Sequence, residues 1–119
     1  MKIIDRSISY SMQIIKMYRD LKRADSVSQI LGKQLLRSGT SIGANIHEAQ
    51  GAQSKADFIA KMSIAHKEAR ESIYWLILIQ KENLLPSHQI QSLLNETTEL
   101  IKTLTAILLS SKKNIASHS

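Results

Sequence analysis

Hydrophobic and polar positions along the chain follow the spacing of amphipathic helices. Apolar residues recur every three or four positions in four stretches, which predicts four helices. The first is expected from about Asp5 to Lys22, and the turn sequence NLLPSH separates the third helix from the fourth. The expected starts of the later helices are Ser26 as an N-cap, Ser54 as an N-cap, and Pro86 or Ser87.

The short connections between these helices set the expected architecture. Successive helices joined by short loops lie antiparallel, so the predicted fold is an all-α, up-down-up-down four-helix bundle. Helices of this length make the bundle elongated. The bundle is expected to cover residues 1–112, and residues 113–119 form a basic and polar tail that is predicted to fray.

Two segments carry more apolar surface than the core of one bundle uses. The apolar residues of the first helix cover an arc of roughly 220°, whereas one core face needs somewhat over 100°. The third helix ends in the run IYWLILI, residues 73–79, which is apolar in every direction. Self-association is therefore predicted. The residues expected at the oligomer interface are Ile14, Met17, Tyr74, Trp75 and Leu78.

Small residues recur every four positions in the second helix. Gly39, Gly43, His47 and Gly51 share this spacing, which predicts a seam where another backbone comes close. The stretch does not match a phosphate-binding loop, because no Lys follows the second glycine and helix patterns lie on both sides. It does not match a zinc motif either, because Gly51 stands where His-Glu-x-x-His needs its second histidine.

Composition indicates where the protein is located and which kinds of functional site it can contain. Hydrophobic residues make up 43% of the chain and aromatic residues only 4%, so the core must be mainly aliphatic. The chain has no cysteine, and charges at Asp5 and Arg6 interrupt the apolar run that a signal peptide needs. A cytoplasmic protein is expected. No catalytic, metal or cofactor constellation is visible, so we expect a protein that is not an enzyme and needs no cofactor.

The charge balance favours a polyanionic partner. The net charge is +6, and residues 1–53 carry eight Lys and Arg against four Asp and Glu. Such cations can neutralise phosphates of RNA or DNA. Glu68 and Glu71 are expected to pair with the neighbouring Lys67 and Arg70 on the same helix. The residues expected to contact phosphates are Lys33, Arg37, Lys55, Lys61, Lys67 and Arg70, with Arg19, Lys22 and Arg23 as a second patch.

Two stretches resemble a known family. The sequences LLRSGTSIGANIHEAQG and FIAKMSIAHKEARESIYWLILI are similar to the two signature regions of the four-helix-bundle family of 23S rRNA intervening-sequence proteins, which includes accessory variability proteins of diversity-generating retroelements. The chain departs from the family pattern Asn-Ile-Ala-Glu-Gly at His47 and Ala49. The matching positions are Arg37, Ser41, Ile42, Asn45, Ile46, Glu48, Phe58, Glu68, Glu71, Tyr74, Trp75 and Leu76.

The resemblance implies a homopentamer with a basic surface, and its retroelement branch implies binding to nucleic acid and a reverse transcriptase. Together with the charge, it suggests an oligomeric bundle that binds RNA or DNA, as an accessory to an rRNA-processing or reverse-transcription complex. The alternative is a protein-binding scaffold whose charge serves solubility. Tyr74 and Trp75 could stack on bases, but aromatic residues inside an apolar run are more typical of a core or an interface.

Overall fold

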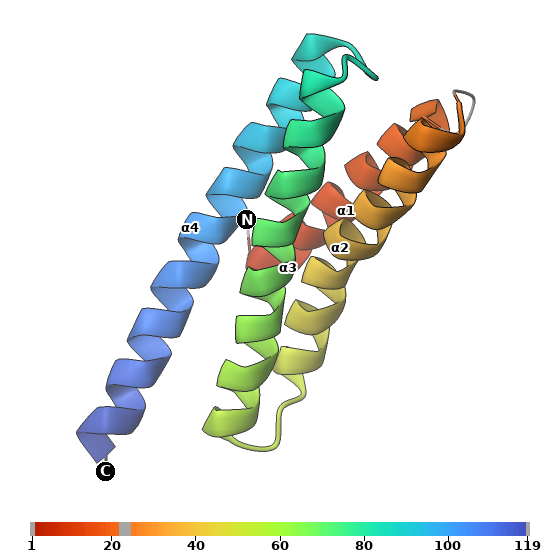
Figure 1. Cartoon of the computed structure of the whole chain (residues 1–119). Coiled ribbons are helices and arrows are strands. Elements are labelled where there is room, and N and C mark those ends of the chain that lie inside the picture. Colours follow the sequence, from red (N-terminus) through yellow and green to blue (C-terminus); the bar gives the residue numbers. More distant parts are fainter. Residues whose placement is uncertain (1, 22–24, 119) are drawn as a thin grey trace.

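The computed structural model describes residues 2–21 and 25–118, and these residues form four α-helices and no strand. The molecule is elongated, at 53 × 23 × 21 Å. Figure 1 shows the helices running up and down along its length, as predicted. The helices are α1 (Ile3–Leu21), α2 (Ser26–Gln50), α3 (Lys55–Lys81) and α4 (Ser87–His118).

Helix order along the chain also sets helix order in space. α2 packs against both α1 and α3, α3 packs against α4, and α1 touches α4 more lightly. The predicted all-α four-helix bundle is therefore confirmed. α1 has 19 residues against 32 in α4, and Figure 1 shows its N-terminus near the middle of the molecule. Over the described residues, the end of the bundle beside the α2–α3 connection therefore consists of three helices.

Capping residues explain where the helices begin and end. The side chain of Asp25 accepts a hydrogen bond from the N–H of Ser28, so Asp25 caps α2 and the expected N-cap at Ser26 is wrong by one residue. Ser54 caps α3 as predicted, because its Oγ accepts the N–H of Asp57 at 3.0 Å. Asn83 adopts a left-handed φ of 54° after α3, a conformation that asparagine tolerates well.

The last helix is longer than the sequence pattern indicated. α4 continues to His118, into the segment predicted as a tail, and the fraying of residues 113–119 stays a prediction. Lys has a high helix propensity and Ser a moderate one, and residues 110–119 contain no proline or glycine that would end the helix.

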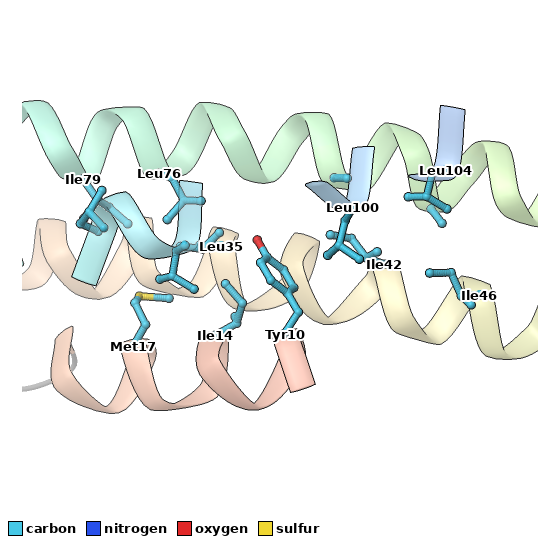
Figure 2. Close-up of a cluster of buried hydrophobic side chains, with 14 of the residues drawn as sticks. Tyr10, Ile14, Met17, Leu35, Ile42, Ile46, Leu76, Ile79, Leu100 and Leu104 are labelled. Atoms are coloured by element: carbon cyan, nitrogen blue, oxygen red, sulfur yellow. The ribbon is translucent and has the colours of Figure 1, made fainter. Parts of the chain in front are cut away.

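The core is mainly aliphatic, as the composition required, and Figure 2 shows part of it. Ile14 and Met17 lie inside it with no exposed area, so their expected place at an oligomer interface is wrong. The exposed side of α1 carries a different set, Ile8, Met12 and Ile15, which we call the α1 stripe. The buried residues labelled in Figure 2 are Tyr10, Ile14, Met17, Leu35, Ile42, Ile46, Leu76, Ile79, Leu100 and Leu104.

The glycines of α2 form the predicted seam over part of its expected length. A methyl group at Gly39 would lie 2.9 Å from Cγ1 of Ile14, and one at Gly43 would lie 3.2 Å from Oγ of Ser7. Both glycines therefore allow α1 to approach the α2 backbone closely. His47 is exposed and Gly51 caps the end of α2, so neither belongs to the seam. Gly32 extends it instead, with a methyl group there 3.0 Å from the ring of Tyr18.

Candidate nucleic-acid interface

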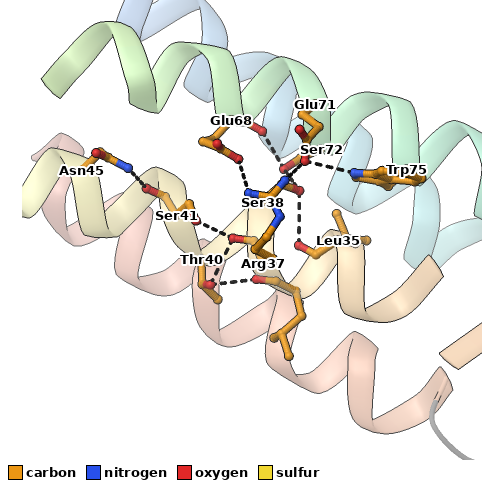
Figure 3. A network of polar contacts seen from close by, with 11 residues as sticks. Leu35, Arg37, Ser38, Thr40, Ser41, Asn45, Glu68, Glu71, Ser72 and Trp75 are labelled. Carbon is orange, nitrogen blue, oxygen red and sulfur yellow. Dashed lines mark hydrogen bonds and ion pairs between the residues drawn. The ribbon is translucent and has the colours of Figure 1, made fainter. Parts of the chain in front are cut away.

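An ionic cluster joins the two stretches that carry the sequence resemblance. Nη1 of Arg37 on α2 donates to Oε2 of Glu68 on α3 at 3.1 Å, and Nη2 donates to Oε2 of Glu71 (Figure 3). Both carboxylates therefore pair with another helix, and the expected pairing of Glu68 and Glu71 with Lys67 and Arg70 is wrong. Because Glu68 and Glu71 stand one turn apart, one guanidinium can bridge them.

Aromatic side chains continue from this cluster along α3. Nε1 of Trp75 donates a hydrogen bond to the same Glu71 oxygen at 3.2 Å. The ring of Tyr74 meets the Trp75 ring edge to face, with centroids 5.1 Å apart and planes at 72°. Arg37, Glu71, Trp75 and Tyr74 thus form one chain of contacts, and Tyr74, at its end, is 55% exposed.

On the interior side of this cluster, buried hydroxyl groups connect α2 and α3. Oγ of Ser38 and Oγ of Ser72 lie 2.9 Å apart, and Ser72 also donates to the carbonyl of Glu68 at 2.9 Å. Both serines are fully buried. Buried hydroxyls need such partners, so the pair favours one register of α2 against α3 and fixes where the ionic cluster sits.

The cations predicted to contact phosphates fall into two groups. Arg37 is held by its two carboxylates, and Lys61 lies 3.0 Å from Oε2 of Glu48, whose hydrogen bond raises the pKa of the Lys61 ammonium. Lys55 lies over the Phe58 ring, 5.5 Å from its centroid, and remains exposed. Lys22 and Arg23 lie outside the described residues. The predicted cations that are exposed and have no carboxylate within 4 Å among the described residues are Arg19, Lys33, Lys55, Lys67 and Arg70.

Among these free cations, the structure brings Lys67 and Arg70 together. They stand three residues apart on the exposed side of α3, with Arg70 one turn and Lys67 two turns before Tyr74. Lys33 lies on α2 and Arg19 on α1, whereas Lys67 and Arg70 share one helix. The sequence prediction named both members of this pair but gave them carboxylate partners that they do not have.

A shallow groove lies between α3 and α4 beside this pair. Its volume is about 490 Å³. Nε2 of His66 and Oγ1 of Thr105 lie 3.0 Å apart across the two helices, and burial, aided by the charges of Arg70 and Lys112, lowers the pKa of His66. Sequence reasoning missed the groove, because it depends on how α3 and α4 are spaced. The residues that line it are His66, Arg70, Ile73, Tyr74, Ile77 and Ile101.

The described residues offer little for other classes of function. They contain no group of three or more His, Cys, Asp or Glu side chains that could hold a metal ion. None of the helices, over the described part of the chain, is long and apolar enough to cross a membrane. Their surface carries the free cations, the exposed Tyr74 ring, the apolar α1 stripe, and further exposed apolar side chains at Val27, Ile30, Ile64 and Leu109.

Comparison with known proteins gives consistent matches. A family model described as 23S rRNA-intervening sequence protein matches residues 1–106. A crystal structure of a protein with unknown function, from the S23 ribosomal protein family and from Bacteroides thetaiotaomicron, is 42% identical to this chain and superposes with a TM-score of 0.83. That match covers 90% of this chain and 98% of the other. No curated protein matches the chain.

Proposed function

This chain belongs to the family of 23S rRNA-intervening sequence proteins, and we propose that it is a non-enzymatic, oligomeric helical bundle that binds RNA or DNA through phosphate contacts. The observation that carries the proposal is the pair of Lys67 and Arg70, exposed on α3 without a carboxylate partner in the described chain. A net charge of +6 supports it. Cations without partners are free to neutralise phosphates and release counterions.

Arg37 and Lys61 are expected to contribute less to phosphate binding than Lys67 and Arg70. Each is already paired with carboxylates of the neighbouring helix. A phosphate would have to displace those carboxylates, so it would gain less from these two side chains. Lys67 and Arg70 can bind a phosphate without first losing a carboxylate partner.

The proposed role is accessory to another process. The family name refers to an intervening sequence in 23S rRNA, which supports rRNA processing as the setting, and the resemblance to retroelement accessory proteins supports reverse transcription. We propose a homo-oligomer in the cytoplasm, a pentamer by family resemblance, in which repeated copies of the cationic pair would contact one nucleic acid together. A reverse transcriptase is a candidate protein partner.

Removing the two free charges tests the proposal. The double variant Lys67→Gln, Arg70→Gln should bind labelled RNA or DNA of unrelated sequences more weakly, and by a similar factor for each, because phosphate contacts carry no sequence information. The matched control is Lys16→Gln, Lys102→Gln, which removes two charges that are paired with Asp20 and Glu99. Fluorescence anisotropy measures both. Equal losses in the two double variants would contradict a specific role for α3.

The alternative function is a protein-binding scaffold, and the α1 stripe favours it. Ile8 is 50% exposed, Met12 65% and Ile15 37%, at helical spacing along one side of α1. Apolar stripes of this kind commonly mark interfaces. Salt separates the two functions, since apolar docking is insensitive to ionic strength and phosphate binding weakens steeply with it.

A further inference from the structure

We infer that Tyr74 is a stacking platform for an unpaired base, so that the groove between α3 and α4 selects single-stranded over double-stranded nucleic acid. The inference deepens the proposed function and rests on it. It depends on three features of the described residues: the exposure of the Tyr74 ring, the contacts that hold this ring, and the combination of apolar floor and free cations around it.

The Tyr74 ring, which the sequence predicts at an oligomer interface, is exposed on the single chain, and the stacking role requires that it stays accessible in the oligomer. It is 55% exposed, whereas its neighbours Trp75 and Leu76 are half-buried and buried. An exposed aromatic ring costs free energy in water and gains it when a flat apolar partner covers one face. Every nucleobase has such a face, which is why aromatic side chains recur in proteins that bind single strands.

The contacts of the ring fix its orientation. Tyr74 packs edge to face on Trp75, and the Trp75 N–H is bonded to Glu71, which Arg37 holds from α2. Figure 3 shows Trp75, Glu71 and Arg37 in this chain of contacts. A ring that is held before binding loses less entropy when a base stacks on it. Arg37, Glu71 and Trp75 are therefore positioning residues for Tyr74.

The surroundings of the ring offer an apolar surface for a base and a cation for its phosphate. The groove beside Tyr74 has an apolar floor of Ile73, Ile77 and Ile101, and its volume of about 490 Å³ is in the range of small-ligand sites. Arg70 lies in the lining, one turn before Tyr74. A base could occupy the apolar part while its phosphate contacts the guanidinium.

Base pairing would prevent this arrangement. In a duplex the bases are stacked on one another, and the outer face of α3 can reach only the phosphates. A single strand can turn one base toward Tyr74 without breaking a base pair. Duplex binding should therefore use Lys67 and Arg70 alone, and single-strand binding should use these cations together with the ring.

The experiment compares two probes, a single-stranded RNA of about 12 nucleotides and the same strand annealed to its complement. Tyr74→Leu, which keeps an apolar side chain, should weaken single-strand binding by roughly 5- to 150-fold and leave duplex binding unchanged. Tyr74→Phe keeps the ring and should bind both probes like the unaltered protein. Because Tyr74 is exposed, both variants should keep the melting temperature, which circular dichroism checks.

A second variant tests the positioning chain. Trp75→Phe removes the indole N–H that bonds Glu71 without changing the net charge, so it should lower the ratio of single-strand to duplex affinity. An unchanged ratio would overturn the positioning role. If Tyr74→Leu binds the single strand as well as the unaltered protein does, the stacking inference is wrong while phosphate binding stands. If the unaltered protein binds neither probe, the inference and the proposed function both fall.

Discussion

Tyr10 places a hydroxyl group at the centre of the bundle. Its Oη lies 2.6 Å from Oγ1 of Thr97, which itself donates to the carbonyl of Leu93 at 2.6 Å. Since the single proton of Thr97 is used in that bond, Tyr10 must be the donor to Thr97. The bond links α1 to α4, the two helices that otherwise touch only lightly. Burial raises the pKa of Tyr10 to about 12.

This raised pKa predicts how Tyr10 contributes to stability at alkaline pH. Below pH 10 the hydroxyl is neutral in both states, and its hydrogen bond should make the protein about 1 kcal/mol more stable than Tyr10→Phe. As the pH rises from 10 toward 12, the unfolded tyrosine ionises and the folded one does not, so stability is lost. Near pH 11 that loss is about 1.4 kcal/mol, which should close the gap to the variant.

Urea unfolding of both proteins at pH 7 and near pH 11 measures the gap directly. Contributions that are common to the two proteins cancel in the comparison. A gap of the same size at both pH values would show that the buried hydroxyl does not have the raised pKa.

At the scale of the helices, the close packing of α1 against α2 depends on the glycine seam. Gly39→Ala should lower the free energy of unfolding by about 1–2 kcal/mol, because the overpacking penalty of about 1–3 kcal/mol exceeds the gain in helix propensity of up to 1 kcal/mol. Ile14 is fully buried and has no space to retreat from the new methyl group. Gly51→Ala is the control, since its nearest atom would be 3.8 Å away.

Chemical denaturation of both variants checks the seam. Ile14→Ala removes all three crowded side-chain atoms, so it should cost less stability in the Gly39→Ala background than alone, and a double-mutant cycle measures this coupling. Equal stabilities of Gly39→Ala and Gly51→Ala would mean that α1 and α2 are less closely packed than the structure has them.

The helices could be predicted from the sequence, but the direction in which α1 faces could not. Ser54 and the NLLPSH turn are local signals, and both mark real helix ends. The apolar arc of α1 is wide enough to include Ile14 and Ile15, and a single helix carries no information about which of them meets α2. Gly39 settles this, because its missing side chain accommodates Ile14 and leaves Ile15 37% exposed.

For the whole molecule, the α1 stripe predicts self-association. The stripe leaves apolar area in water, and an interface would remove it. Light scattering of the unaltered protein should give a multiple of the 13.4 kDa chain mass, and Met12→Glu should reduce that mass without lowering the helix content. Ile14→Glu is the contrasting variant, because a charge in the core should unfold the chain. A mass near 13.4 kDa for the unaltered protein would contradict the prediction.

The candidate interface was only partly predictable. Residue types and charge pointed to Lys67 and Arg70, and the motif resemblance pointed to Arg37, Glu68 and Glu71. Which carboxylate pairs with which cation depends on the register of α2 against α3, and local spacing favoured the wrong partners. The groove beside Tyr74 depends in turn on the packing of α3 against α4, which no pattern within a single helix describes.

The most direct test of phosphate binding through α3 is the salt dependence of affinity for a single-stranded oligonucleotide. Anisotropy titrations over a series of salt concentrations give the slope of log K against log salt for the unaltered protein and for Lys67→Gln, Arg70→Gln. We expect a clearly negative slope that becomes less steep in the variant by roughly 1.4 for each chain that contacts the strand, about 0.7 for each lost phosphate contact. A slope near zero, or the same slope in both proteins, would contradict the proposed interface.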